Sequence, residues 1–352
     1  IMAYTTIDDP SAHFHTRLYS GNGSTQSITN NANAGNFKPD WLWIKERTST
    51  SQNFLFDSNR GVGKYLHSDS TSSEGNDVHN TSFDSNGFGV GQQNGTNENS
   101  QTYVAWQWVA NGGTTSSNSN GDITSTVQTN STAGFSIGTY TGDADNSHSV
   151  GHGLGTTPAW IIVKRREGSH SWIVWHQNLT ATSAYAVDLE NTDAEANNTS
   201  YFHDTAPDAN TFHPGDGGAT NGSGGTYVFY AFKEIKGYSK FGSYKGNGNA
   251  NGAFIYTGFR PAWIMVKLIS GSGEDWHIFD SSRSTSNVVK ERLIASGSAA
   301  ENANDSILDF VSNGFKFKES NAGWNGNGNT YIYMAFAEHP FVSSEGVPVT
   351  AR

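Results

Sequence analysis

The stretch TYIYMAFAEHPF, residues 330–341, decides the fold because the chain contains it three times in related form. The other two copies are TYVFYAFKE at residues 226–234 and TYVAWQW at residues 102–108. Each begins with Thr-Tyr and continues as an almost unbroken apolar run, which is typical of a central strand buried on both faces. Three copies of one strand predict a chain built from three similar units.

Other motifs precede each copy in the same order. The first is a Trp-rich strand pattern, found as WLWIK at 41–45, WIIVK at 160–164 and WIMVK at 263–267. From Pro158 to Pro261 and from Thr226 to Thr330 the chain runs nearly the same length, about a hundred residues, which is the signature of an internal repeat.

The repeat predicts an all-β fold. Each unit holds many short strand candidates separated by Gly, Asn and Pro turns, the pattern of an antiparallel β-sandwich. We therefore predict three tandem antiparallel β-sandwich units of jelly-roll type. Only residues 286–296 could be helical, and the Tyr- and Val-rich equivalent at 183–191 favours a strand for both. The predicted boundaries are 1–109 for unit 1, 110–133 for an extended polar linker, 134–236 for unit 2, 237–341 for unit 3 and 342–352 for a C-terminal tail.

The linker carries a weak strand signal of its own. In DITSTVQTN, residues 122–130, the side chains alternate with the period of a strand, but the apolar face is thin. Such a strand is marginal alone and gains stability by adding to the edge of another sheet. We expect it to lie along a neighbouring unit or subunit.

Composition narrows the function. The chain has 352 residues, a formal net charge of −11 and a pI of about 5.5. An acidic surface does not attract phosphate backbones, so we expect no nucleic-acid partner. The chain has no cysteine, and we find no apolar run long enough to span a bilayer, so we expect no membrane insertion. Ile1 stands before Met2, which is the expected start.

One charged pair recurs. Asp57 and Arg60 in FDSNR reappear as Asp280 and Arg283 in FDSSR, whereas unit 2 has only His176 and the glutamine after it. The pair could bind a ligand. We favour a turn after a strand, capped by the Asp and paired locally with the Arg.

Carboxylates and histidines offer weaker candidates. Glycosidases need two carboxylates across a sugar, but no acidic pair recurs in all units, and solvated loops are favoured. Two same-face histidines can share a metal ion, but no third ligand is visible, so we expect no metal and no cofactor. The candidates are Asp143 and Asp145, Asp188 and Glu190, Asp204 and Asp208, Asp305 and Asp309, and the histidines His13, His15 and His152.

The loop GWNGNGN supplies the candidate binding residues. An aromatic ring packs on the apolar face of a sugar, and amides bond to its hydroxyls. A packing role is the more common one for a loop Trp, but the combination makes this loop the candidate glycan contact. Its residues are Trp324, Asn325, Asn327 and Asn329.

Several long motifs together resemble a known family. They include the opening AYTTIDDPSAHFHTRLYSGNG, the line KPDWLWIKER, the bridge from residue 111 to 142, VGHGLGTTPAWIIVK, the TYIYMAFAEHPF stretch and the final PVTAR. In this order they are similar to uncharacterised virion proteins of tailed phages, prominent among phages of marine cyanobacteria and other marine bacteria. The resemblance covers essentially the whole chain.

The resemblance implies a component of the virion surface, a tail-fibre or tail-associated structural protein that contacts other virion proteins and the host. It brings no catalytic residues, and we expect no enzyme activity. It also implies a homo-oligomer, with a trimer favoured because such fibres are typically three-fold. The alternatives are a capsid decoration or head-fibre protein, or a carbohydrate-binding adhesin module that contacts a host surface glycan.

Overall fold

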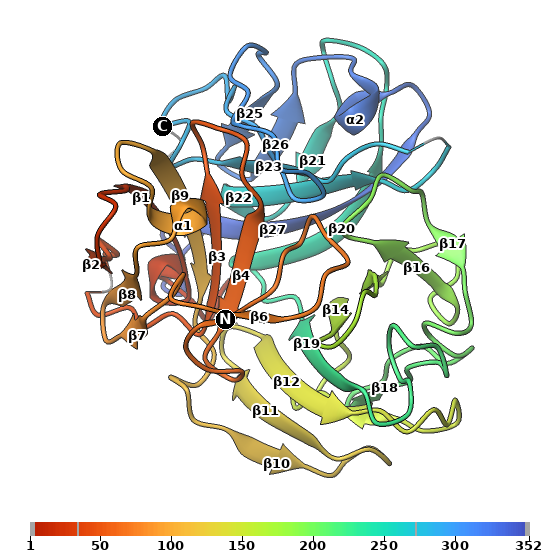
Figure 1. Cartoon of the computed structure of the whole chain (residues 1–352). Helices are drawn as coiled ribbons and strands as arrows, with labels where there is room; N and C mark the ends of the chain where they lie inside the picture. Colours follow the sequence, from red (N-terminus) through yellow and green to blue (C-terminus); the bar gives the residue numbers. More distant parts are fainter. Residues whose placement is uncertain (1–3, 34, 272, 349–352) are drawn as a thin grey trace.

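The computed structural model describes every residue except 1–3, 34, 272 and 349–352, so Ile1 and Met2 lie outside the described residues. Its regular structure is almost entirely β, as predicted (Figure 1). The helical turns in the described part of the chain are short: η1 (Pro10–Ala12), α1 (Asn94–Asn97) and α2 (Ala322–Asn325). Residues 286–296 contain no helix but the short strand β24 (Leu293–Ile294), so the strand preference there is confirmed.

The first part of the chain forms one main antiparallel sheet and two small sheets. The main sheet has the order β1 (Phe14–Ser20), β9 (Thr102–Trp108), β3 (Trp41–Glu46), β4 (Asn53–Asp57). The small sheets are β2 (Gln26–Thr29), β8 (Gly87–Val90), β7 (Ser82–Asp84), and β5 (Lys64–Tyr65) with β6 (Gly75–Asn76).

The middle part forms an eight-stranded sheet and a two-stranded one. The large sheet has the order β10 (Ser116–Asn118), β11 (Ser125–Asn130), β12 (Phe135–Thr141), β19 (Thr226–Phe232), β14 (Trp160–Arg165), β15 (Trp172–His176), β16 (Tyr185–Asp188), β17 (Ala196–Asn197). The small sheet pairs β13 (Val150–Gly151) with β18 (Thr211–Phe212). Residues 110–133, expected as a polar linker, thus contribute β10 and β11, and β11 adds to the edge of the sheet at β12 of the same chain.

The last part again forms a main sheet and a small one. The main sheet has the order β20 (Ser239–Lys245), β27 (Thr330–Pro340), β22 (Phe259–Leu268), β23 (His277–Asp280), β24. The small sheet has the order β21 (Phe254–Tyr256), β26 (Gly314–Phe317), β25 (Leu308–Val311).

Four strands follow the same order in each part. The sheets contain β1-β9-β3-β4, β12-β19-β14-β15 and β20-β27-β22-β23, and the TY-containing strand is always second. The registers agree as well, since Trp41, Trp160 and Trp263 lie opposite Trp108, Phe232 and Phe336. We call residues 14–108, 135–232 and 239–340 the first, second and third segments, and residues related by these registers equivalent.

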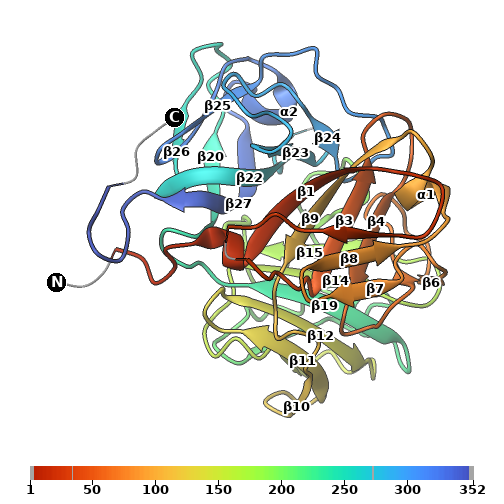
Figure 2. The same cartoon turned by 90° about the vertical axis from the view of Figure 1, so that its left-hand side faces the viewer.

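The three segments lie around one another (Figure 1; Figure 2) and share an apolar core. One buried cluster contains side chains from all three main sheets. Its members include Trp41, Trp106, Trp160, Tyr230, Trp263 and Phe336. Each main sheet therefore turns one face towards the other two segments.

The opposite face of each main sheet packs on the small sheet of its own segment. Separate buried clusters hold Leu42 with Phe88, Ile161 with Phe212, and Ile264 with Phe315. Every residue of β3 is buried for this reason. The near-continuous apolar runs of the sequence are explained by burial on both faces.

Candidate functional site

Trp324 has the packing role that is the more common one for a loop Trp, and the candidate glycan contact is wrong for Trp324 and Asn325. Trp324 is fully buried, with its ring 5.1 Å from the ring of His277 and inside the apolar cluster of the third segment. Asn325 is also fully buried, so neither can meet a sugar. Asn327 is exposed and Asn329 is half-buried, but without the Trp they form no stacking site.

Asn325 shapes a turn, and an Asn with the same role occurs in each of the other two segments. Its side-chain oxygen accepts the N–H of Asn247 at 3.0 Å. Asn97 and Asn221, its equivalents, do the same for Asn22 and Asp143, each at 3.0 Å. Three buried amides with one bonding pattern indicate a structural requirement of each segment.

The Asp-Arg pairs are structural, as favoured from the sequence. The side chains of Asp57 and Arg60 are fully buried and bonded to each other, and so are those of Asp280 and Arg283. The Asp57 carboxylate also accepts the N–H of Arg60 at 2.7 Å, which caps the turn. The side chains of both pairs are therefore closed to a ligand.

Each pair also bonds to the next segment. The hydroxyl of Tyr230, in the second segment, donates to Asp57 at 2.7 Å, and the indole N–H of Trp106, in the first segment, donates to Asp280 at 3.0 Å. These bonds join segments whose sequences are far apart. The pairs therefore hold the segments together.

The third such junction, between the second and third segments, has no charged pair at this place. His176 stands where the others have Asp, Leu179 where they have Arg, and Met334 where they have Tyr230 or Trp106. The side chain of Met334 has no N–H or O–H to donate. An unpaired charge is costly in a buried network, and this junction lacks the Asp, the Arg and the donor together.

Equivalent lysines cross all three junctions. The Nζ of Lys164 donates to the carbonyl of Thr71 at 3.2 Å, that of Lys267 to Asn191 at 3.4 Å, and that of Lys45 to Ser298 at 3.3 Å. The Lys164 bond joins the second segment to the first, the Lys267 bond joins the third to the second, and the Lys45 bond joins the first to the third. The segments thus form a closed ring.

Burial lowers the pKa of Lys45, Lys164 and Lys267 to about 8 each, although nearby carboxylates oppose the shift for all three. An unfolded lysine keeps a pKa of about 10.4. Between about pH 8 and pH 10 the unfolded chain therefore binds more protons than the folded chain, and stability rises with pH.

We expect the free energy of unfolding to rise between pH 8 and pH 10 by roughly 1 kcal/mol per pH unit for each lysine. Above that window the buried tyrosines oppose the trend, because burial raises the pKa of Tyr103 and they ionise first in the unfolded chain. Urea denaturation across this range measures it. Lys164→Met should flatten the slope by about a third, whereas Lys316→Met, at a partly exposed position, should leave it unchanged. A slope that is flat or falling in the unsubstituted protein would contradict the assignment.

The histidines are placed in separate surroundings. His15 bonds to the side chain of Asn31 at 3.1 Å, and burial lowers its pKa. His13 packs edge-on against Tyr238, and His152 lies 3.2 Å from the carbonyl of Asp208. Among the residues that the structure describes, no group of three His, Asp or Glu side chains is arranged to hold a metal ion.

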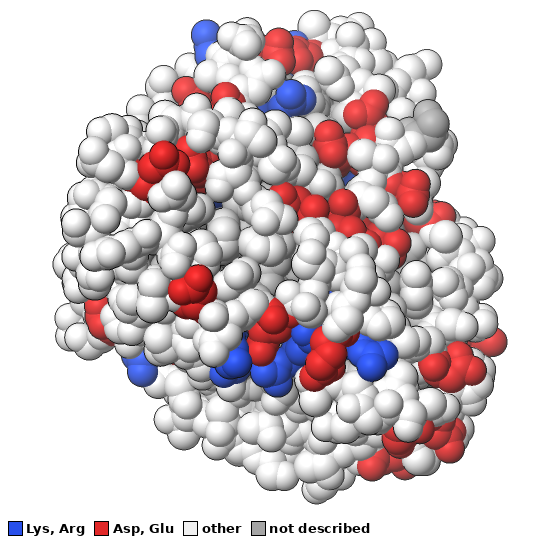
Figure 3. All heavy atoms as spheres, in the orientation of Figure 1, with Lys and Arg blue, Asp and Glu red and all other residues white. Residues whose placement is uncertain are grey.

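The acidic pairs serve their loops. Asp143 bonds to His148 at 2.6 Å on the surface, and Asp208 accepts the N–H groups of Asn210 and Thr211 at 2.7 Å each. Asp309 pairs with Lys318 at 3.2 Å. Asp188 differs, because burial, with a contribution from Glu190, raises its pKa to about 6. On the face shown in Figure 3, Asp and Glu are spread in small clusters over a mostly uncharged surface.

The remaining candidate is a set of three grooves, one beside each junction. In the groove between the first and second segments, Asn59 donates its amide to the carbonyl of Thr126 on β11 at 3.1 Å. The chain's own strand occupies this position, so we call it the filled groove.

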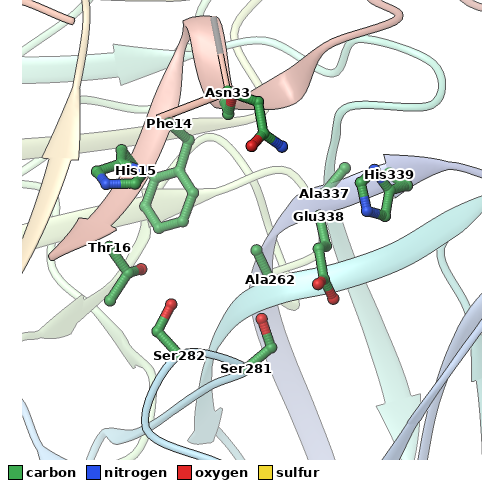
Figure 4. A pocket seen from close by; sticks show the side chains of 11 residues that line it. Phe14, His15, Thr16, Asn33, Ala262, Ser281, Ser282, Ala337, Glu338 and His339 are labelled. Carbon is green, nitrogen blue, oxygen red and sulfur yellow. The ribbon is translucent and has the colours of Figure 1, made fainter. Parts of the chain in front are cut away.

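The groove between the third and first segments is a small pocket (Figure 4). Its volume is about 180 Å³. Phe14 and His15 of β1 line one side, and Ser281 and Ser282 the other. We call it the histidine groove. Glu338, which also lines it, is held by Arg260 at 2.6 Å.

The groove between the second and third segments is larger and aromatic. Its volume is about 470 Å³. Tyr244 and Tyr333 line it with Phe254 and Tyr256, residues that are 48% and 55% exposed. Asn178 and Lys245 add an amide and a cation. We call it the aromatic groove, and it is the strongest candidate binding site. Its signal in the sequence was FIY at residues 254–256, an alternation with large rings outward.

The fold defines the class of the protein as all-β, with several antiparallel sheets. Its buried Asp-Arg pairs hold the segments together, and its open grooves lie beside sheet edges. Within the described residues no helix is long and apolar enough to cross a membrane. The chain belongs to the family described as a domain of unknown function, DUF7483, whose model matches residues 9–340. No curated protein and no solved structure was found to match the chain.

Proposed function

We propose that the protein is a non-enzymatic structural component of a phage particle, exposed on the virion surface as a tail-fibre or tail-associated element. We also propose that its three segments are copies of one β-sandwich unit, as the common strand order supports. The proposal includes a homo-oligomer, with a trimer expected from the resemblance to fibre-like virion proteins.

One observation carries the non-enzymatic part. The Asp-Arg pair that recurs along the chain lies in the interior, since the side chains of Asp57 and Arg60, and of Asp280 and Arg283, are fully buried and bonded to each other. General acid–base catalysis needs titratable groups that reach a substrate. The residues that line the aromatic groove include rings, an amide and lysines but no carboxylate and no histidine. Such a surface suits binding and assembly.

The test is to purify particles of a phage that encodes this chain and to identify their proteins by mass spectrometry. We expect the chain at a constant ratio to the major capsid protein, and antibody labelling in electron micrographs on the tail. Labelling over the capsid would favour the decoration or head-fibre alternative. Absence from purified particles would overturn the virion assignment, and release of reducing sugar from host envelopes by the purified protein would overturn the non-enzymatic one.

A further inference from the structure

The aromatic groove is the counterpart of the filled groove. Strand β20 of the third segment is equivalent to β12 of the second. Tyr244 on β20 lies opposite Tyr331, as Tyr140 on β12 lies opposite Tyr227. Strands β21 and β13 correspond too, because Ile255 pairs with Phe315 as Val150 pairs with Phe212. The walls of the two grooves are therefore the same structural elements.

The filled groove shows what such walls can hold. Strand β11 pairs antiparallel with β12 from Thr126 to Asn130, and Val127 lies opposite Gly138 and packs into the apolar cluster of the second segment. The hydroxyl of Ser125 donates to the carbonyl of Gly151 on β13 at 2.6 Å. An extended strand thus bridges the edge of the main sheet and the edge of the small sheet.

No strand of the described chain fills the aromatic groove. Its exposed rings, Phe254 and Tyr256, stand at the positions of Ser149 and Gly151, which the bridge covers in the second segment. Gly242 stands at the position of Gly138, which lies opposite Val127. Both glycines leave room for a neighbouring ring, since the ring of Tyr333 lies over Gly242 as that of Phe229 lies over Gly138.

The amide that holds β11 is also repeated. Asn178 stands two residues after His176, as Asn59 stands two after Asp57, and it lines the aromatic groove. Its side chain is exposed. It is placed to donate to a main-chain carbonyl in the groove, as Asn59 does to Thr126.

The edge of β20 limits how far a strand can pair. Phe241 is already satisfied, because its carbonyl accepts from Gln177 at 2.6 Å and its N–H donates to Glu234 at 3.2 Å. Main-chain groups alternate in direction along a strand, so those of Ser243 and Lys245 also point away from β27. A strand would pair with these two residues and end at Phe241.

Charge distinguishes the occupant from β11. Lys245 is exposed at one end of the groove. Lys240, at the other end, is partly exposed and paired with Glu234 at 2.9 Å. Lys236 lies near by, 4.4 Å from the ring of Tyr4. The groove is therefore flanked by cations although the chain as a whole has a formal net charge of −11.

We propose that the aromatic groove binds an extended segment of a partner protein by strand addition to β20. The segment carries a small β-branched residue opposite Gly242, flanked by acidic residues that meet Lys240 and Lys245. Phe254 and Tyr256 cover its outer face, and Asn178 holds a main-chain carbonyl. Main-chain bonds supply affinity and alternate side chains supply specificity in this mode of recognition. The proposal is independent of where the protein acts.

The probes are two labelled peptides: ITSTVQTN, the sequence of residues 123–130, and the same peptide with Glu at its first and last positions. Fluorescence anisotropy measures binding to the full chain. We expect saturable binding of both and tighter binding of the acidic peptide at low salt. The double variant Phe254→Ser, Tyr256→Thr, which installs the residues of the equivalent positions Ser27 and Thr29, should weaken binding at least tenfold. Asn178→Ala should weaken it less.

The control is Val62→Ser, at another exposed apolar position (50%), which should leave binding unchanged. Unchanged melting temperatures of all variants show that the fold is kept. No binding of either peptide at millimolar concentration would overturn the proposal, as would equal binding to the double variant. Binding of an acidic oligosaccharide but neither peptide would assign the groove to a glycan instead. A dimer of the free protein that the double variant abolishes would identify a second copy as the occupant, and would also overturn the proposal.

Discussion

Asp280→Ala is expected to lower the free energy of unfolding by about 3–5 kcal/mol, the cost of leaving a buried charge without its partner. The side chain of Arg283 is fully buried, and without Asp280 its remaining carboxylate partner is Glu301, which it shares with Arg47. The indole N–H of Trp106 loses its acceptor as well. Urea denaturation of the variant and the unsubstituted protein measures the loss.

The matched control is Asp309→Ala. Asp309 pairs with Lys318, whose side chain is 39% exposed, so this pair is hydrated. Its loss should cost less than about 1 kcal/mol. Equal effects of the two substitutions would show that the Asp280 pair has no special role at the junction.

A triple variant tests whether the junction between the third and first segments can form without its charged pair. Asp280→His, Arg283→Leu and Trp106→Met reproduce His176, Leu179 and Met334 of the junction between the second and third segments. Replacing a buried ion pair as a set is often nearly neutral, while removing one partner is not. Trp106→Met also removes core volume, so the triple variant should lose less stability than the sum of the losses of Asp280→Ala and Trp106→Met, and a loss equal to that sum or larger would contradict the view that the members are exchanged as a set.

Tyr331→Ala is the second large effect, with an expected loss of about 3–5 kcal/mol. The ring is fully buried and stacks on Tyr244 at 5.0 Å between centroids. The hydroxyl donates to the carbonyl of Ala322 at 2.5 Å and accepts the N–H of Gly326 at 2.8 Å, which closes the turn before β27. The substitution removes core volume and the closure of the turn together.

Tyr331→Phe separates the two contributions. It keeps the ring and leaves the two main-chain groups without their partner, so we expect a loss of about 1–3 kcal/mol. Tyr256→Ala, at a ring that is 55% exposed, is the control and should have little effect on stability. Melting curves compare all three. If Tyr331→Ala melts like Tyr256→Ala, the closing tyrosine is not part of the core.

The strands could be predicted because their signal is local. The closing tyrosines Tyr103, Tyr227 and Tyr331 begin apolar runs in the same sequence context, and all three are fully buried. The turn-capping role of Asp57 and Asp280 could also be read from their place after a strand. The edge pairing of β11 followed from its alternating residues, although the sequence did not show which sheet it joins.

The common core and the junctions could not be predicted. They depend on contacts such as that between Arg47 and Glu301, whose side chains meet at 2.7 Å although about 250 residues separate them. No local periodicity records such a contact. Both faces of each main sheet are apolar in the sequence, so the face that packs between segments cannot be told from the face that packs within one segment.

The glycan alternative for Trp324 arose because GWNGNGN resembles a loop tip. A signal against that view was present: Asn97, Asn221 and Asn325 each stand six residues before the closing tyrosine of their segment. A constant spacing of this kind indicates a turn with a fixed hydrogen-bonding pattern. It places the residue before each Asn inside the fold, where Thr96, Thr220 and Trp324 are all fully buried.

The closed ring has a consequence for the order of the chain. Because an equivalent lysine bond crosses the junction between the third and first segments as it crosses the other two, that junction closes the ring although the two segments lie at opposite ends of the chain. Near the two ends of the described chain, the N–H of Ser344 donates to Asp8 at 2.6 Å. A circular permutant that joins these ends and opens at the exposed Lys236, between the second and third segments, would keep every junction. The same architecture can thus be encoded from more than one starting point, and the ends can be moved to where an appended domain has room.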